Sequence, residues 1–309
     1  MASTLSLGVY QIPDTTTNRR HWGNLDQAAM SLVIADAVKA QSGVALVIVQ
    51  DSQTAESVRQ ELRLFLPSSI PVMLFPDWET LIYDSFSPHQ DIVSDRLAIL
   101  NELPALKEGV LVVPASTVMQ KIAPRSFTLG SSFVLDKGQR FDLEAMRMRL
   151  TASAYRCVDT VFEHGEFAVR GSIMDIFPMG IDHPFRIDLF DDEIESIRVF
   201  DPETQRSIEQ VESIRLLSAR EFPLTDDAIK RFQDRWHQHF QADPRKCPIY
   251  QDVSQGSSPP GIEYYLPLFF DELETLFDYL PDNTLVFTAD IEDAVNASWQ
   301  AAESRYENL

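Results

Sequence analysis

The chain has 309 residues, of which 44% are hydrophobic and 24% charged, a composition typical of folded globular proteins. This length predicts two or three compact units, because single cores rarely grow beyond a few hundred residues. The formal net charge of −21 argues against a chain that grips nucleic acid by itself, since neutralising phosphates supplies most sequence-independent affinity.

Two further features of the sequence indicate where in the cell the protein is located. No apolar run approaches the roughly 20 residues that a membrane-spanning helix needs, and the first arginines follow the weak apolar stretch near the amino terminus, the wrong order for a secretory signal. We therefore expect a cytoplasmic protein with no membrane partner. Cys157 and Cys247 are too few and too far apart for a disulfide framework or a metal knuckle, and we interpret them as ordinary thiols.

The first third of the chain alternates between helical and strand patterns, which predicts a parallel α/β layer. Its expected elements are a helix over 24–41, a strand over 44–49, a helix from Asp51 or Ser52 to 65, a strand over 71–75, an ordered loop packed by its own side chains over 77–91, a helix over 94–103, a strand over 110–113 and a further helix capped by Ser116. Buried parallel strands read as continuous apolar runs, as 44–49 does.

The pattern changes after Phe127. A strand over 133–135, a helix over 143–152 and a dense β region over 158–200, with turns at 179–184 and 191–192, predict a small and mostly antiparallel domain. The remainder contains a helix over 225–240, a segment over 254–261 that is either a linker or a surface loop, a strand over 285–287 and a helix from 290 onward.

A nucleotide site is not expected in the α/β layer. The chain contains no Gly-Lys dipeptide, and the segment 23–33, with Gly23, Met30 and Ser31, offers neither the glycines nor the lysine of a phosphate-binding loop. We expect no ATP hydrolysis, no cofactor and no metal in this chain.

Other candidate sites have plainer interpretations. Asp191, Asp192 and Glu193 are better explained as a hairpin turn than as a cation site. We interpret His164, close to Glu166, as a structural or interface histidine, because no nucleophile or metal-ligand spacing accompanies it.

The outward face of the β domain is the most informative surface. If Phe167, Val169, Ile187 and Leu189 point inward, strand alternation sends three residues outward, namely Arg170, Arg186 and Phe190. Arginine and phenylalanine are typical of binding hot spots. The alternative is that Phe190 is buried against a neighbouring domain and that the arginines pair with Asp188 or Glu166.

Three motifs resemble a known family. The run over 164–201, HGEFAVRGSIMDIFPMGIDHPFRIDLFDDEIESIRVFD, is similar to domain 2 of UvrB and of bacterial transcription-repair coupling factors; DWETLIYDSFSPHQDIVSDR, over 77–96, and GIEYYLPLFF, over 261–270, look like the coupling-factor versions of the flanking domains. The resemblance spans essentially the whole chain.

The resemblance implies a fold and a domain order. The fold class is α/β, a degenerate P-loop-type (RecA-like, UvrB-like) parallel α/β layer with an inserted small, mostly antiparallel α+β domain. The domains are 1–130 (1A), 131–217 (2, which binds UvrA) and 218–309 (1B, packing back on 1A).

The resemblance also implies a function. The chain would be a non-catalytic module that recruits UvrA through Arg170, Arg186 and Phe190, with contributions from Glu166, Asp188 and Asp192. ATP with Mg, RNA polymerase and DNA would be bound by a translocase beyond Leu309. An alternative hypothesis, compatible with this one, is that the module also folds back on that translocase as an autoinhibitory clamp. The rival hypothesis is a nucleotide-dependent DNA helicase fragment like UvrB. Charge reversal at Arg186 or truncation of Phe190 is expected to weaken UvrA binding without unfolding the domain.

Overall fold

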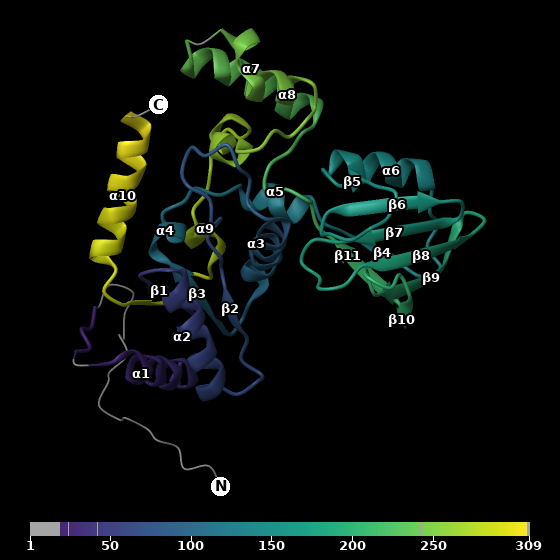
Figure 1. The fold of residues 1–309 in the computed structure, drawn as a ribbon. Helices are drawn as coiled ribbons and strands as arrows, with labels where there is room; N and C mark the ends of the chain where they lie inside the picture. Colours follow the sequence, from purple (N-terminus) through teal and green to yellow (C-terminus); the bar gives the residue numbers. More distant parts are fainter. Residues whose placement is uncertain (1–18, 24, 42, 242, 308–309) are drawn as a thin grey trace. The chain divides into compact units, whose positions relative to one another are not determined.

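The computed structural model describes residues 19–23, 25–41, 43–241 and 243–307, which form two compact units (Figure 1). The first unit combines the described residues up to Asp77 with Glu102–Gln120 and those from Thr275 onward, and the second combines Trp78–Asn101 with Lys121–Glu274. The second unit therefore interrupts the first in sequence, as expected for an inserted domain. The finer division at 130 and 217 stays a prediction.

The first unit is built on a parallel sheet, which confirms the predicted α/β layer. The strands are β1 (Val44–Val49), β2 (Val72–Leu74), β3 (Gly109–Pro114) and β12 (Leu285–Thr288), in the order β12-β1-β3-β2. Every residue of β1 and β3 is buried, as continuous apolar strands between helical layers should be. The pairing of β12 with β1 could not be predicted, because some 240 residues separate them in the sequence.

Two of the helices of the first unit are capped by aspartates. They are α1 (Gln27–Ala40), α2 (Ser52–Phe65), η1 (Leu103–Ala105), α4 (Ala115–Val118), α9 (Leu276–Tyr279) and α10 (Glu292–Glu307). Asp26 caps α1 by accepting from the backbone N–H of Ala29, and Asp51 caps α2 by accepting from that of Thr54. The predicted cap at Ser116 is wrong: Pro114 precedes α4, and the Ser116 hydroxyl donates to Asp77 instead.

The second unit contains a six-stranded sheet in the order β10-β9-β8-β7-β6-β5 (Figure 1). Its strands are β5 (Arg156–Cys157), β6 (Glu166–Arg170), β7 (Ile173–Phe177), β8 (Phe185–Phe190), β9 (Glu193–Phe200) and β10 (Ser207–Val211). All neighbours pair antiparallel except β5 and β6, which confirms the predicted antiparallel domain.

One face of this sheet, the inner face, is covered. Phe167, Ile187 and Leu189 lie in one hydrophobic cluster with Leu150 of α6 (Leu143–Ala152), and Val169 packs against that cluster. The inward orientation of these four strand residues, which the sequence predicted, is therefore confirmed. Two further strands, β4 (Phe133–Asp136) and β11 (Ser213–Leu216), form a separate antiparallel pair.

The rest of the second unit is helical. It consists of α3 (Gln90–Glu102), α5 (Arg125–Gly130), α7 (Asp226–His239), η2 (Pro244–Lys246), α8 (Pro248–Ser254) and η3 (Ile262–Leu268). An aromatic cluster with Phe232, Trp236 and Phe269 holds α7 to η3. The segment 254–261 lies between α8 and η3 within this unit, so it is a loop and not a linker between units.

The segment 77–91 is an ordered loop, as predicted, but residues far away in the sequence hold it. Trp78 is buried and donates to Glu221, and the hydroxyls of Thr80 and Tyr264 lie 2.6 Å apart. Gly261 has a φ of +81°, and a Cβ there would lie 2.4 Å from the carbonyl oxygen of Asp84. Only glycine fits this close approach. No helix of the described residues could cross a membrane.

Candidate functional site

The candidate site is the outer face of the six-stranded sheet, opposite the inner face that α6 covers. Its outward side chains form three successive rows across the strands. The first contains Asp175, Arg186 and Arg198, the second Arg170, Asp188 and Ser196, and the third Phe190 and Glu193. The three residues predicted to face outward therefore share one face, with Phe190 about 13 Å along β8 from Arg186 at roughly 3.3 Å per residue.

Arg186 lies in the first row and is held on several sides. Its Nε and Nη2 donate to the two carboxylate oxygens of Asp175, at 2.7 and 2.8 Å. Its Nη1 donates to the carbonyl of Gln205, and the guanidinium lies 4.8 Å from the ring centre of Phe200. The bond to Asp175 raises the pKa of the guanidinium. The side chain of Arg186 is only 18% exposed, so it is less open to a partner than strand alternation suggested.

Arg170 and Phe190 are the open members of the face. The side chain of Arg170 is 52% exposed, and its Nη2 donates to the carbonyl of Asp159 at 2.8 Å. Phe190 is 74% exposed and ends β8 at the turn that leads into β9. An arginine and an unburied aromatic ring on one rigid sheet are the kind of anchor that protein partners bind.

The three accessory candidates differ from one another. Glu166 is buried and accepts from Arg156 and from the backbone N–H groups of Phe162 and Glu163, so it stabilises its own turn. Burial alone would raise the pKa of Glu166, but these hydrogen bonds lower it below its usual value.

Asp188 and Asp192 remain on the surface of the sheet. Asp188 accepts from Arg198 and from the hydroxyl of Ser196, and Asp192 lies 3.5 Å from Arg140 in an exposed ion pair. Both carboxylates already pair with arginines of this chain, so they contribute less net negative charge to the face than unpaired carboxylates would.

The pairing that the sequence offered as an alternative is wrong, because Arg170 and Arg186 do not pair with Asp188 or Glu166. Phe190 is exposed within the second unit, and its burial against a neighbouring domain stays an untested alternative. Asp175 takes Arg186, while Arg198 and Arg156 take the other two carboxylates.

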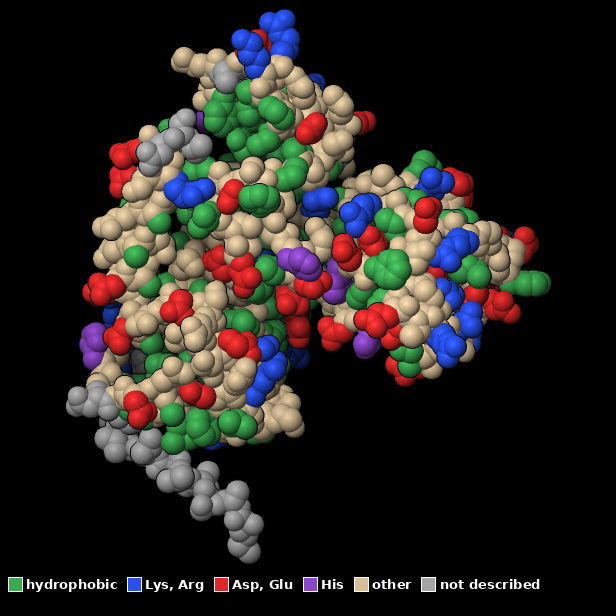
Figure 2. All heavy atoms as spheres, in the orientation of Figure 1, with side chains coloured by type: hydrophobic (Ala, Val, Ile, Leu, Met, Phe, Trp, Pro, Cys, Tyr) green, Lys and Arg blue, Asp and Glu red, His purple; other side chains and the backbone are tan. Residues whose placement is uncertain are grey.

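Sequence reasoning missed Asp175 and Arg198. Asp175 lies between the buried residues Met174 and Ile176 of β7, and extending the alternation from β8 to β7 would have placed it beside Arg186. Figure 2 shows Lys and Arg side chains gathered over this sheet, in a chain whose net charge is −21.

The degenerate phosphate-loop segment named from the sequence lies at the start of α1. Gly23 precedes this helix, Met30 and Ser31 lie within it, and the hydroxyl of Ser31 donates to Glu61. One strand-to-helix junction of the parallel sheet, between β1 and α2, is 49–54, with the sequence VQDSQT. It contains no glycine or lysine, and the carboxylate of Asp51 already occupies the amino terminus of α2.

Two other features are structural. His164 lies 2.8 Å from Asp91 and 3.0 Å from the carbonyl of Ile181 through its two ring nitrogens. It therefore links segments of the second unit. Asp191 has a φ of +56° in the turn between β8 and β9, as the hairpin interpretation predicts.

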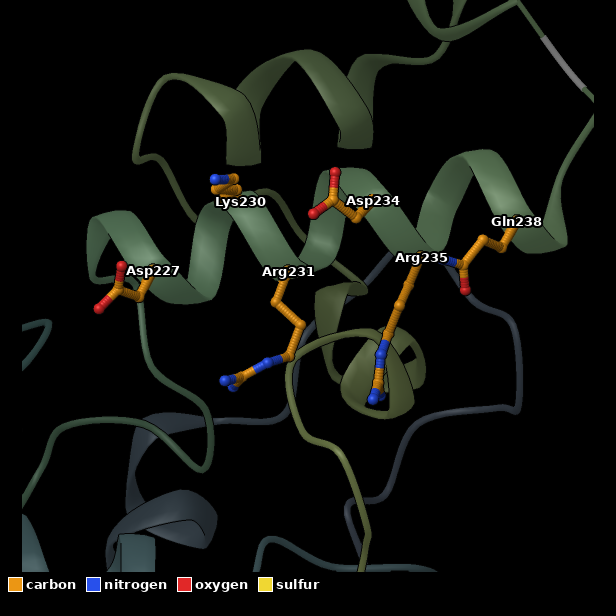
Figure 3. Close-up of a pocket in the computed structure, with 6 residues that line it drawn as sticks. All are labelled: Asp227, Lys230, Arg231, Asp234, Arg235 and Gln238. Carbon is orange, nitrogen blue, oxygen red and sulfur yellow. The ribbon is translucent and has the colours of Figure 1, made fainter.

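A surface hollow runs along α7 (Figure 3). Its lining is Asp227, Lys230, Arg231, Asp234, Arg235 and Gln238. Arg231 and Arg235 point toward the segment after η3 (Figure 3), where they donate to the carbonyls of Phe269 and Phe270 and lie close to Asp271. Because Arg231 and Arg235 already donate to groups within the fold, few of their hydrogen-bond donors remain available to a ligand in the hollow.

The comparisons with known proteins agree with this geometry. Residues 133–222, which include the whole outer face, match the family model of the UvrB interaction domain. The chain thus carries a domain of the class that UvrB also contains.

The relatives extend the match over nearly the whole chain. It is 45% identical over 301 residues to the transcription-repair-coupling factor of Escherichia coli (strain K12), covering 97% of this chain and 26% of that protein. It is 43% identical to that of Haemophilus influenzae, over 96% of this chain and 26% of the relative, and 32% identical to that of Mycobacterium tuberculosis, over 86% and 22%. The chain belongs to the transcription-repair-coupling factor family, and it spans about a quarter of the length of these relatives.

Proposed function

We propose that the chain is a non-catalytic, UvrA-recruiting module of a transcription-repair coupling factor. The observation that carries the proposal is the outer face of the six-stranded sheet, where Arg170 and Phe190 are exposed on the domain that matches the UvrB interaction family. A protein partner suits this face better than a small ligand, because the face offers ionic and apolar anchors without an enclosing cavity.

The parallel unit acts as a scaffold in this proposal. The chain contains no Gly-Lys dipeptide, and the carboxylate of Asp51 at the amino terminus of α2 would repel a phosphate there, so the helicase-fragment hypothesis is not favoured. Displacement of stalled RNA polymerase, ATP turnover with Mg and DNA tracking would belong to the remaining length of the parent protein, which would act in the cytoplasm. That remainder would also be able to cover the outer face and mask it until UvrA is needed.

The test is a titration of purified UvrA against the chain and two variants, Arg170→Ala and Phe190→Ala. Each variant should bind at least about thirtyfold more weakly, the equivalent of about 2 kcal/mol for a central interface residue. Both residues are exposed, so both variants should keep the thermal unfolding of the wild type.

Matched controls lie on α6, which packs on the inner face. Arg147→Ala and Met148→Ala remove an exposed arginine and an exposed apolar side chain there, and both should bind UvrA like the wild type. Wild-type affinity in both outer-face variants would refute the proposed site.

A further inference from the structure

The outer face is organised around one buried carboxylate. Asp175, in the middle of β7, is 2% exposed and lies opposite Ala168 of β6 and Arg186 of β8. An ionised carboxylate taken out of water is costly unless it is paired and hydrogen-bonded. Among the described residues, side chains of the outer face, Arg186 and Arg170, meet that requirement for Asp175.

Asp175 contacts both arginines of the proposed surface. It accepts two hydrogen bonds from Arg186 in a fork, and its Oδ2 lies 3.9 Å from Nη2 of Arg170. The fork fixes the plane of the Arg186 guanidinium as well as its position. Stacking on Phe200 and the bond to Gln205 hold the same plane from other directions.

The arrangement resembles a preorganised binding surface more than a stability device. A buried ion pair is weak evidence for stability, because desolvation offsets most of the attraction. Holding a long side chain in place before binding, however, removes the cost of ordering it during binding. Arg186 has lost that freedom before any partner arrives.

We infer that Asp175 is the positioning residue of this surface, which fixes Arg186 and steadies Arg170 so that both guanidinium groups meet UvrA in one arrangement. The inference rests on the proposed function, because it assigns a role within the same surface. Asp175 itself is too buried to contact UvrA and acts through the arginines.

This positioning limits how UvrA can use Arg186. An arginine has five N–H donors, and three of those in Arg186 already serve Asp175 and Gln205. A carboxylate of UvrA cannot form the two-bond fork on the Nε edge, so it must approach the two remaining N–H groups at the end of the guanidinium. The more exposed Arg170 is the arginine that offers UvrA more of its surface.

The experiment replaces Asp175 by asparagine, which keeps the shape and one acceptor but removes the charge. UvrA affinity should fall roughly tenfold, the equivalent of about 1.4 kcal/mol. In the free chain, the NMR signal of the Arg186 Nε–H should change from slow to fast exchange with water, a change that a general loss of stability would not confine to one side chain.

The matched control is Glu221→Gln, which also neutralises a buried carboxylate paired with an arginine, Arg96, but lies outside the six-stranded sheet. Its affinity for UvrA should equal that of the wild type within about twofold, less than 0.5 kcal/mol. If Asp175→Asn fails to fold, Asp175→Glu keeps the charge and shifts the carboxylate by one methylene; it should both move the Arg186 signal and weaken binding.

Two outcomes separate the inference from the function it rests on. Wild-type affinity of the Asp175 variants, with the Arg186 signal altered and with Arg170→Ala and Phe190→Ala still weakened, would overturn the positioning role alone. Wild-type affinity in Arg170→Ala and Phe190→Ala would overturn the proposed surface, and the positioning role with it.

Discussion

The outer face of the six-stranded sheet and the β1–α2 junction of the parallel sheet differ in how their charges are used. At the junction, Asp51 points at its own helix and accepts from the backbone of Thr54. On the outer face, the carboxylate of Asp175 accepts two hydrogen bonds from Arg186. The carboxylate of Asp51 caps a helix, whereas the carboxylate of Asp175 holds an arginine of the outer face.

In both regions, what a carboxylate does depends on where it lies in the fold more than on its charge alone. The chain is strongly acidic, yet the carboxylates of the outer face are mostly paired with arginines from neighbouring strands. Those pairs leave the exposed Arg170 and Phe190 as the parts of the face that a partner meets first. Substitutions on the six-stranded sheet and ligand addition at the β1–α2 junction test the two regions separately.

The largest expected effect is on stability and concerns Arg186→Glu. The new carboxylate would face the buried Asp175, and breaking a buried pair costs on the order of 3 kcal/mol or more. Denaturant unfolding should show a loss of that size. The structure thus changes the expectation that charge reversal at Arg186 spares the fold. Arg170→Glu, at an exposed position, should lose much less, and equal losses in the two variants would contradict the ion-pair argument.

A smaller effect is expected in the pH dependence of stability. The folded-state pKa of Glu166 is lowered, so Glu166 stabilises the fold above its unfolded pKa of about 4.3, and this contribution is lost as the pH falls through the lower folded value. Glu166→Gln should therefore be less stable than the wild type at pH 7, and the difference should shrink in acid. Thermal unfolding at several pH values measures this; a difference that grows in acid would refute the assignment.

The smallest expected effect is at the β1–α2 junction, where ATP with Mg should leave the melting temperature unchanged. A ligand present at a hundred times its dissociation constant would stabilise the fold by about 2.7 kcal/mol, which is easily seen. A reproducible rise with ATP concentration would show a nucleotide site, and it would remove the contrast between the two regions.

Much of the fold could be predicted because the signals are local. The burial of β1, the start of α2 at Asp51 and the alternation along β8 follow from apolar runs, capping residues and period two. The resemblance of the 164–201 run to UvrB-type domains was equally readable, and it pointed to the domain that the family model matches.

The misses have a different cause. Serine is a common helix cap, but the hydroxyl of Ser116 donates to the carboxylate of Asp77 instead. Arg96 shows no signal in the sequence at all, although it is fully buried and paired with Glu221 at 2.6 Å.

The sequence by itself determined which elements form, which face of each strand is apolar, and that Arg170, Arg186 and Phe190 point away from the core, since these properties depend on residues a few positions apart. Only the tertiary structure decided which charges meet across strands. Asp175 and Arg186 belong to different strands; alternation places both on the outer face, but only the fold shows that the carboxylate is buried and paired with the guanidinium. Strand pairing and burial decide that, because they set both the distance between the charges and the dielectric in which they interact.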